Sequence, residues 1–195
     1  MRGRGMGANV IITEIDPLPG LRAVMDGFRV MKMDEAAPLG DIFCTATGMK
    51  DVIVGRHMDM MKDGVLLSNT GHYDCEINIA ELKERSVSMR TIRPENDEYT
   101  LANGNTIHLL ADGRLVNLAA AEGHPSEVMD MSFANQFLSL CRLAAESDQL
   151  EAQVYDISLE QDMGLAKTKL ETLGFSIDEL TQEQITYSTD YTAGT

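Results

Sequence analysis

The carboxylate of Glu14 is the first side chain whose position in the sequence suggests a specific chemistry. It ends a short, largely apolar run, residues 9–14, and Asp16 and Pro17 follow it closely. Such a run predicts a buried parallel strand. At the carboxyl end of this kind of strand, doubly wound folds place an acid that binds the hydroxyls of an adenosine ribose. A solvated carboxylate at a strand end is the alternative that these residues leave open.

A glycine-rich segment precedes this strand. Gly3, Gly5 and Ala8 formally fit the dinucleotide-binding spacing G-x-G-x-x-A. That fingerprint follows a strand and stands about 20 residues before its acid, whereas here it precedes the strand and lies too close to Glu14. We therefore expect the segment to close a helix, and the phosphate-binding loop of such a fold to lie upstream of Met1.

Small and polar residues stand at the ends of two further predicted strands, residues 41–46 and 64–69. Open α/β sheets bind ligands at the carboxyl ends of parallel strands, and a turn of small residues lets a cofactor approach the backbone closely. These residues are therefore candidates for cofactor binding, and plain strand-to-helix turns are the alternative. The candidates are Thr45, Thr47, Gly48, Asn69, Gly71 and His72.

Two of the four histidines are candidates for acid–base catalysis. His72 and His124 each follow a glycine in a predicted loop, and a loop histidine near carboxylates can exchange protons near neutral pH. A surface or capping role is the alternative. His57 and His108 fall on a predicted helix and a predicted hairpin strand, so we expect them to be structural. No Cys or His pair has the spacing of zinc ligands, and we expect no metal site.

The elements that position these residues alternate between strands and helices in the first half of the chain. This rhythm predicts an α/β fold, a doubly wound, Rossmann-like parallel sheet with helices on both faces. The first β-α unit of such a sheet is expected to be missing. Strands are predicted at residues 9–14, 28–30, 41–46, 64–69 and 87–91, and helices at 21–26, 33–39, 54–62 and 76–85.

The rhythm changes after Ile92. Asn103, Gly104 and Asn105 tolerate positive φ and predict a hairpin, and the apolar spacing beyond residue 126 predicts a long helix. We expect residues 1–125 to form a partial dinucleotide-binding domain and residues 126–195 to form a helical region. The elements predicted here are hairpin strands at 99–102 and 106–111, a loop at 112–125, helices at 126–146, 159–173 and 177–185, and a frayed end at 188–195.

Composition excludes several classes of partner. The 195 residues carry a formal net charge of −15, which argues against nucleic acid, whose phosphates attract Lys and Arg, and against an anionic membrane surface. No apolar run reaches the roughly 18 residues of a transmembrane helix. The cysteines Cys44, Cys75 and Cys141 are widely spaced, which is typical of a reduced, cytoplasmic protein.

Three stretches of the chain resemble one enzyme family. They are GANVIITEIDP at residues 7–17, KDG through NTGHYD at 62–74, and GRLVNL at 113–118 with GHPS at 123–126. In these motifs the chain resembles adenosylhomocysteinase, the S-adenosyl-L-homocysteine hydrolase family. The likeness runs from Gly5 to about Tyr187, and the last two motifs are long and specific.

The resemblance implies an enzyme with tightly held NAD in a Rossmann domain and a nucleoside in a separate substrate domain. The family oxidises the ribose 3′-hydroxyl of S-adenosylhomocysteine, expels homocysteine, adds water and returns the hydride to give adenosine. By matching motif, Glu14 would hold the cofactor's adenosine ribose, and Thr47 would line the cofactor. Residues 69–72 would lie near the nicotinamide, Asn117 would bind its carboxamide, and His124 would face the substrate and help gate its entry.

The same resemblance implies that the helix from Ser126 returns to the substrate domain and that the C-terminal helices make subunit contacts in a homo-oligomer, a dimer or tetramer. The chain departs from the family's pattern in lacking its phosphate loop and its substrate domain with the catalytic Lys, Asp, Glu and Cys. Pro19 replaces a polar cofactor-binding residue, and residues 188–195 lack the usual Lys-and-Tyr ending.

We therefore interpret the chain as the C-terminal part of an adenosylhomocysteinase that is inactive by itself. One alternative is a 2-hydroxyacid dehydrogenase-like oxidoreductase, although the GHPS motif is not its pattern. The other is a non-catalytic remnant that acts only in subunit association, because half of a Rossmann sheet exposes an edge and an apolar face that need covering.

Overall fold

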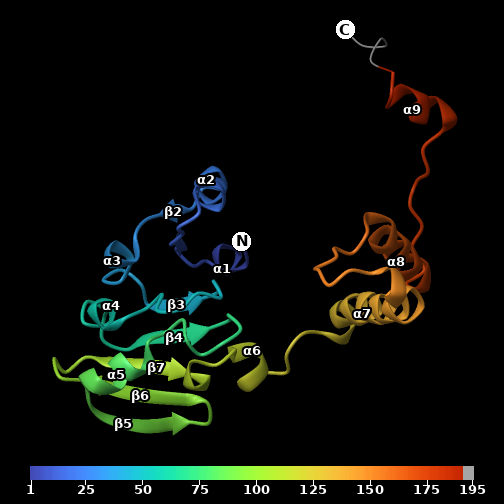
Figure 1. Cartoon of the computed structure of the whole chain (residues 1–195). Coiled ribbons are helices and arrows are strands. Elements are labelled where there is room, and N and C mark those ends of the chain that lie inside the picture. The colour runs from blue at the N-terminus through green and yellow to red at the C-terminus, as the bar shows by residue number, and fades with distance from the viewer. Residues whose placement is uncertain (191–195) are drawn as a thin grey trace. The chain divides into compact units, whose positions relative to one another are not determined.

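The computed structural model of the chain describes residues 1–190 (Figure 1). Its contacts divide the chain into a first unit, Met1–Gly123, and a second unit, His124–Thr195. Each unit is described by itself below. Among the described residues, no helix is both long enough and apolar enough to cross a membrane.

The first unit begins with a small two-stranded sheet. Strand β1 (Ile11–Ile12) pairs in parallel with β2 (Arg29–Val30), and helix α2 (Pro17–Met25) connects them. This helix starts earlier than the predicted 21–26, because Asp16 Oδ1 accepts the N–H of Leu18 at 2.9 Å and caps the N-terminus. The short helix α1 (Arg2–Gly5) precedes β1, so the prediction that the glycine-rich segment closes a helix is confirmed.

A five-stranded sheet forms the rest of this unit, in the order β3-β4-β7-β6-β5. Strands β3, β4 and β7 are mutually parallel, and β6 and β7 form the predicted antiparallel hairpin. The bounds are β3 (Ile42–Thr45), β4 (Val65–Asn69), β5 (Ser86–Arg93), β6 (Asn96–Leu101) and β7 (Thr106–Leu110).

Strand β5 corrects the sequence interpretation. Its place in the β-α rhythm predicted a parallel neighbour, but it pairs antiparallel with β6 at the edge of the sheet. Only Pro94 and Glu95 separate Arg93 from Asn96, which face each other in the ladder. A link this short closes a hairpin, whereas a parallel neighbour requires a crossover of a dozen or more residues.

The parallel strands form an incomplete sheet, as expected, because β1 and β2 are separate from the other strands. In a doubly wound sheet the first strand lies between the second and the fourth. The two groups, β2-β1 and β3-β4-β7, follow that order on either side of the first-strand position, and no strand described in residues 1–190 joins them. The α/β, Rossmann-like class itself holds.

Two short helices pack beside the five-stranded sheet. Helix α4 (Gly55–Met58) and helix α5 (Ile79–Arg85) are both shorter than predicted. Helix α5 begins only after Asn78, whose Oδ1 accepts the N–H of Glu81 at 3.0 Å, so residues 76–78 form a loop. The core that these elements enclose includes Ile53, Met58, Leu67, Ile77, Leu82, Ile107 and Leu109.

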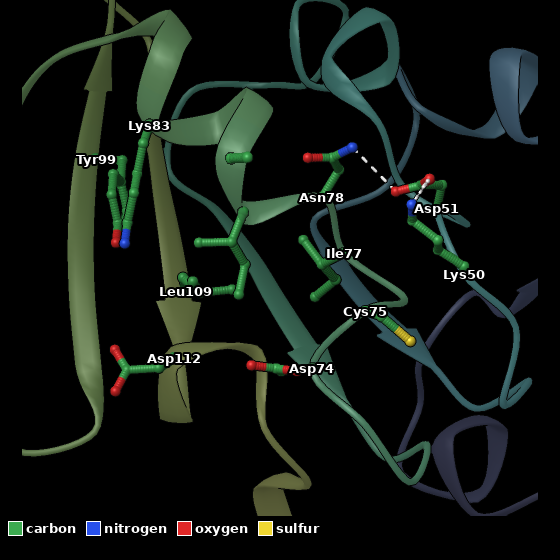
Figure 2. Close-up of a pocket in the computed structure, with 12 residues that line it drawn as sticks. Lys50, Asp51, Asp74, Cys75, Ile77, Asn78, Lys83, Tyr99, Leu109 and Asp112 are labelled. Atoms are coloured by element: carbon green, nitrogen blue, oxygen red, sulfur yellow. Dashed lines mark hydrogen bonds and ion pairs between the residues drawn. The ribbon is translucent and has the colours of Figure 1, made fainter.

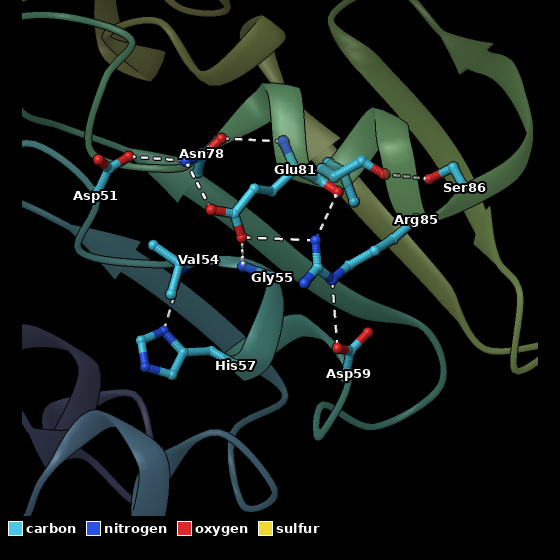
Figure 3. A network of polar contacts seen from close by, with 10 residues as sticks. Asp51, Val54, Gly55, His57, Asp59, Asn78, Glu81, Arg85 and Ser86 are labelled. Carbon is cyan, nitrogen blue, oxygen red and sulfur yellow. Dashed lines mark hydrogen bonds and ion pairs between the residues drawn. The ribbon is translucent and has the colours of Figure 1, made fainter.

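A polar network ties α4 to α5 (Figure 3). Glu81 Oε2 accepts the N–H of Gly55 at 2.6 Å. Arg85 approaches both Glu81, at 3.6 Å, and Asp59, at 3.3 Å. A Cβ on Gly55 would overlap the Arg85 guanidinium, so this close approach requires glycine. These contacts hold α4 and α5 in fixed positions relative to each other.

The end of the first unit contains short helical turns where a loop was predicted. They are η1 (Ala111–Gly113) and α6 (Val116–Ala119). Near the start of the unit, α3 (Met33–Ala36) is also a single helical turn, shorter than the predicted 33–39. The turn η1 follows β7 directly and α6 follows η1, so both come after the carboxyl end of a parallel strand. That position makes the 112–125 segment part of the same sheet edge as the turns after β3 and β4.

The second unit consists of helices. Helix α7 (Ser126–Glu146) has its predicted bounds, and a 3-10 turn, η2 (Ser147–Gln149), follows it. Helix α8 (Leu159–Thr172) packs on α7 through an ion pair of 2.6 Å between Lys169 and Asp130. Helix α9 (Gln182–Tyr187) begins later than the predicted 177–185, because Thr181 caps it. Of the end predicted to fray, residues 191–195 lie outside the described part of the chain.

Candidate functional site

The carboxyl ends of β3 and β4 and the segment after β7 meet at one edge of the sheet. In the register of β3 and β4, Thr45 faces Asn69, and Asn69 forms a parallel bridge with Leu115. The N–H of Thr70 donates to Thr45 O at 2.7 Å. The turns that carry most of the predicted site residues are thus brought together.

Asn69 is the centre of this edge and is fully buried. Its Nδ2 donates to the carbonyls of Tyr73 at 2.7 Å and Gly113 at 2.9 Å. Its Oδ1 accepts the N–H of Gly71 at 2.7 Å and the hydroxyl of Thr45 at 3.1 Å. An amide side chain can donate two hydrogen bonds and accept two. The hydrogen-bonding capacity of the Asn69 side chain is therefore filled by other residues of the chain. Asn69 holds the surrounding turns in place.

The two threonines of the β3 turn are also engaged by the chain. Thr45 is buried, with its hydroxyl on Asn69, and the hydroxyl of Thr47 donates to Glu76 at 3.0 Å. Gly48 adopts φ +70°, and a Cβ placed on it would meet no atom within 4 Å. The surface that this turn offers to a ligand is therefore the open side of Gly48, as the small-residue pattern predicts.

Glu14 lies exposed just beyond β1. Its Oε1 accepts the backbone N–H of Ile15 at 2.7 Å and of Asp16 at 3.1 Å. These bonds, that of Asp16 first, lower the pKa of the carboxyl below its ordinary value. Within residues 1–190 the other oxygen, Oε2, makes no hydrogen bond. Glu14 is thus an oriented, ionised carboxylate with one acceptor oxygen free for a ligand.

Three further predicted residues carry polar groups that the described chain does not use. His72 is exposed and lies edge-on to Tyr73, with ring centroids 4.3 Å apart. Asn117 lies half-buried on α6, and its side-chain amide has no hydrogen-bond partner within residues 1–190. His124 is exposed and is the first residue of the second unit, so it is described apart from His72.

The two histidines expected to be structural are placed as predicted. His57 is 3% exposed on α4, and its Nδ1 accepts the N–H of Val54 at 3.2 Å, which leaves the proton on Nε2. That atom lies 3.0 Å from Asp34 Oδ1. Burial, and after it the charge of Arg56, lowers the pKa of His57. His108 lies on β7 beside Asn96, with 3.3 Å between Nδ1 and Oδ1.

Sequence reasoning missed Glu76, a fully buried carboxylate next to the site. Its oxygens accept the N–H groups of Thr47 and Gly48. The helix predicted over residues 76–85 includes Glu76, and that pattern does not set its carboxylate apart from the other acids of the helix. The available signal was Asn78, a good N-cap residue that places Glu76 in the loop before α5.

A pocket of about 790 Å³ opens beside this region but contains none of the predicted site residues (Figure 2). It lies between α5 and the β6–β7 hairpin, with Ile77, Leu109 and Tyr99 in its wall. Asp51 binds Asn78 at 2.9 Å and Lys50 at 3.5 Å on its rim. Lys50 and Asp51 on this rim pair with each other, whereas Glu14 Oε2 and the Asn117 amide make no hydrogen bond within residues 1–190. We therefore place the candidate site at the strand ends.

The first unit matches a known family of domains. Residues 2–123 match a family model described as S-adenosyl-L-homocysteine hydrolase, NAD binding domain. The adenosylhomocysteinase of Saccharolobus solfataricus is 56% identical over 194 residues, covering 100% of this chain and 46% of that protein. That of Aeropyrum pernix is 56% identical over 186 residues, covering 95% and 45%. That of Nostoc sp. is 51% identical over 195 residues, covering 100% and 46%.

The chain therefore spans about half the length of the curated relatives it matches. The family model covers more than half of the chain and bears out both the Rossmann-like class and NAD as the cofactor. The relatives extend the likeness through the helices of the second unit. The chain belongs to the S-adenosyl-L-homocysteine hydrolase family, and its residues 2–123 are an NAD-binding domain of that family.

Proposed function

We propose that this chain supplies the NAD-binding part of an enzyme that reversibly hydrolyses S-adenosyl-L-homocysteine to adenosine and L-homocysteine. The observation that carries the proposal is the division of polar groups among the segments that follow the parallel strands. Some of these side chains form hydrogen bonds with other residues of the chain, namely those of Thr45, Asn69 and Thr47. Glu14 Oε2 and the Asn117 amide make none within residues 1–190 and remain available to a ligand.

The available groups fit NAD in kind. A carboxylate oxygen at a strand end accepts hydrogen bonds from the paired hydroxyls of a ribose, and Glu14 supplies it. A carboxamide needs both a donor and an acceptor, and the amide of Asn117 has both. The open side of Gly48 gives room for close approach to the backbone. When bound, NAD would supply a reversible hydride acceptor for C3′ of the substrate ribose, while the 3′-hydroxyl gives up its proton to a base.

We assign the acid–base work of the chain to its two loop histidines. His72 is exposed at the sheet edge beside the Gly71 turn, where an imidazole can take a proton from a hydroxyl and return it. His124 would perform the substrate-facing part from the start of the second unit. The substrate's homocysteine portion would be handled by groups outside this chain, since the curated relatives are about twice its length.

We also propose a cytoplasmic location and a homo-oligomeric assembly. Support for the location comes from the three cysteines, none of which is in a disulfide, as expected of a reducing compartment. Support for assembly comes from the second unit, where Phe133, Phe137 and Leu140 on α7 are each more than half exposed. A helix face that exposes several large apolar side chains is usually covered by another protein surface.

A homocysteine-release assay tests the proposed activity. The chain is assayed by itself and as a fusion to the part of the Saccharolobus solfataricus relative that lies outside the matched segment; this fusion is called the completed protein below. Released homocysteine is detected as a new thiol, with enzyme-only samples correcting for the chain's own three cysteines. We expect turnover by the completed protein and none by the chain alone.

The outcomes separate the alternatives. Turnover by the chain alone would show that it is not an incomplete enzyme. A completed protein that binds NAD and releases no homocysteine would support a role in subunit association only. A completed protein that instead oxidises NADH with 2-oxoacids would identify a 2-hydroxyacid dehydrogenase. The matched control is the intact Saccharolobus relative, assayed under the same conditions.

A further inference from the structure

Glu76 is a buried carboxylate that no cation neutralises. Its side chain is fully buried, and it takes part in no ion pair within residues 1–190. Its oxygens accept the N–H of Gly48 at 2.6 Å, the N–H of Thr47 at 3.0 and 3.1 Å, and the Thr47 hydroxyl at 3.0 Å. Burying a charged carboxylate costs free energy unless hydrogen-bond donors surround it. The four hydrogen bonds to Glu76 supply those donors, and they connect it to the turn after β3.

The backbone around Glu76 is fixed independently of its side chain. The N–H of Ile53 donates to Glu76 O at 3.0 Å, and the N–H of Asn78 donates to Ile53 O at 2.8 Å. Ile53 and Ile77 form a parallel bridge, and both are fully buried in the core. The Glu76 carboxylate therefore connects an anchored segment, residues 76–78, to the turn after β3 at residues 47–48. We call this connection the clamp.

The same carboxylate limits the β4 turn. A Cβ on Gly71 would overlap Glu76 Oε1, so the acid leaves room only for glycine there, and the Gly71 N–H donates to Asn69 Oδ1 at 2.7 Å. Glu76 thus lies between the Thr47–Gly48 turn and the Gly71–His72 turn. It also occupies the N–H groups of Thr47 and Gly48, which consequently cannot serve as a phosphate cradle.

We propose that Glu76 is a positioning residue that sets the spacing between the β3 and β4 turns against which NAD binds. The inference rests on the proposed function, because it concerns the same site. Glu76 does not contact the cofactor. It holds the Thr47–Gly48 backbone with its N–H groups turned inward, so that the open side of Gly48 and the His72 ring face the ligand at a fixed separation.

The test compares Glu76→Gln with Glu81→Gln. Both substitutions replace a carboxylate that accepts a backbone N–H at 2.6 Å, Gly48 for Glu76 and Gly55 for Glu81. Glu81 lies in the α4–α5 network (Figure 3), away from the turns. Hydrogen–deuterium exchange of the chain reports the clamp without NAD, and equilibrium dialysis of the completed protein gives the Kd for NAD.

We expect Glu76→Gln to speed amide exchange at residues 47–48 and to weaken NAD binding about tenfold, as loss of one well-placed hydrogen bond to a charged group does. Glu81→Gln should speed exchange at Gly55 and leave the Kd unchanged. If Glu76→Gln fails to fold, Glu76→Asp keeps the charge and withdraws it from its donors, and the same two effects are expected.

Four results would overturn parts of this reasoning. An unchanged Kd in the Glu76 variants, with wild-type protein binding NAD, rejects the positioning role alone. Equal weakening by Glu81→Gln shows that general destabilisation, and not the turn, accounts for the effect. Wild-type completed protein that binds no NAD rejects the proposed function and this inference with it, whereas unchanged exchange at residues 47–48 rejects the clamp whatever the Kd.

Discussion

Replacing Asn69 with alanine should cost the chain a large part of its stability. The substitution removes the acceptor of the Gly71 N–H and of the Thr45 hydroxyl and the donor to the Gly113 carbonyl, which are all buried. Each buried group left without a partner costs about 1–3 kcal/mol. The Tyr73 carbonyl is only partly buried and can turn to water. Three such groups give an expected loss of roughly 6 kcal/mol in the free energy of unfolding.

Asn105→Ala is the matched control. Asn105 also presents a side-chain amide to a backbone carbonyl, but it makes one such bond, Nδ2 to Met61 O at 3.1 Å. Removing a single partly buried bond should cost about 1 kcal/mol. The two variants therefore lose the same side-chain atoms and differ mainly in how many buried groups they leave unpaired.

Urea unfolding followed by circular dichroism measures the difference, in dilute solution so that association does not intervene. The slope of the unfolding free energy with urea should be equal among the three proteins, so that a change in midpoint reports stability. We expect the midpoint of Asn69→Ala to fall several times further than that of Asn105→Ala. Equal shifts would refute the reasoning, because they would mean that the bonds of Asn69 are replaced by water.

Three other predictions follow from the site. Glu14→Ala in the completed protein should weaken NAD binding about tenfold through lost charge-assisted hydrogen bonds; an equal Kd in dialysis removes Glu14 from the site. His72→Ala and His124→Ala should each slow homocysteine release by roughly 100-fold or more with little change in Tm, because both side chains are exposed; a large drop in Tm with normal turnover would assign them a structural role. Stability should fall as pH drops through about 6.5, because the lowered pKa of buried His57 means that the unfolded chain binds the proton more readily; thermal melts of His57→Gln should lack this part of the slope, and an unchanged slope contradicts it.

The sequence alone determined where the strands end and which turns follow them. Apolar runs and turn residues are local signals, so β3, β4 and the β6–β7 hairpin fall where they were predicted. Helix α7 has its predicted bounds for the same reason, since its apolar period is long. Local motifs were also enough to indicate the family, which the comparison confirms.

Pairing between strands was less predictable. The alternation of strands and helices suggested a parallel β5, and only the tight Pro94–Glu95 link reveals that it turns back on β6. Periodicity reports which face of an element is buried and carries no information about its neighbour.

The tertiary structure alone decided which polar residues are free. In the sequence, Thr45, Asn69 and Asn117 are equivalent candidates for cofactor binding, yet two of them are consumed by the fold and one is not. Glu76 could not be singled out at all, because its donors lie 28 and 29 residues earlier in the chain. A hydrogen bond is set by atoms within about 3 Å of each other. Which atoms come that close is determined by the packed sheet edge and not by any local pattern.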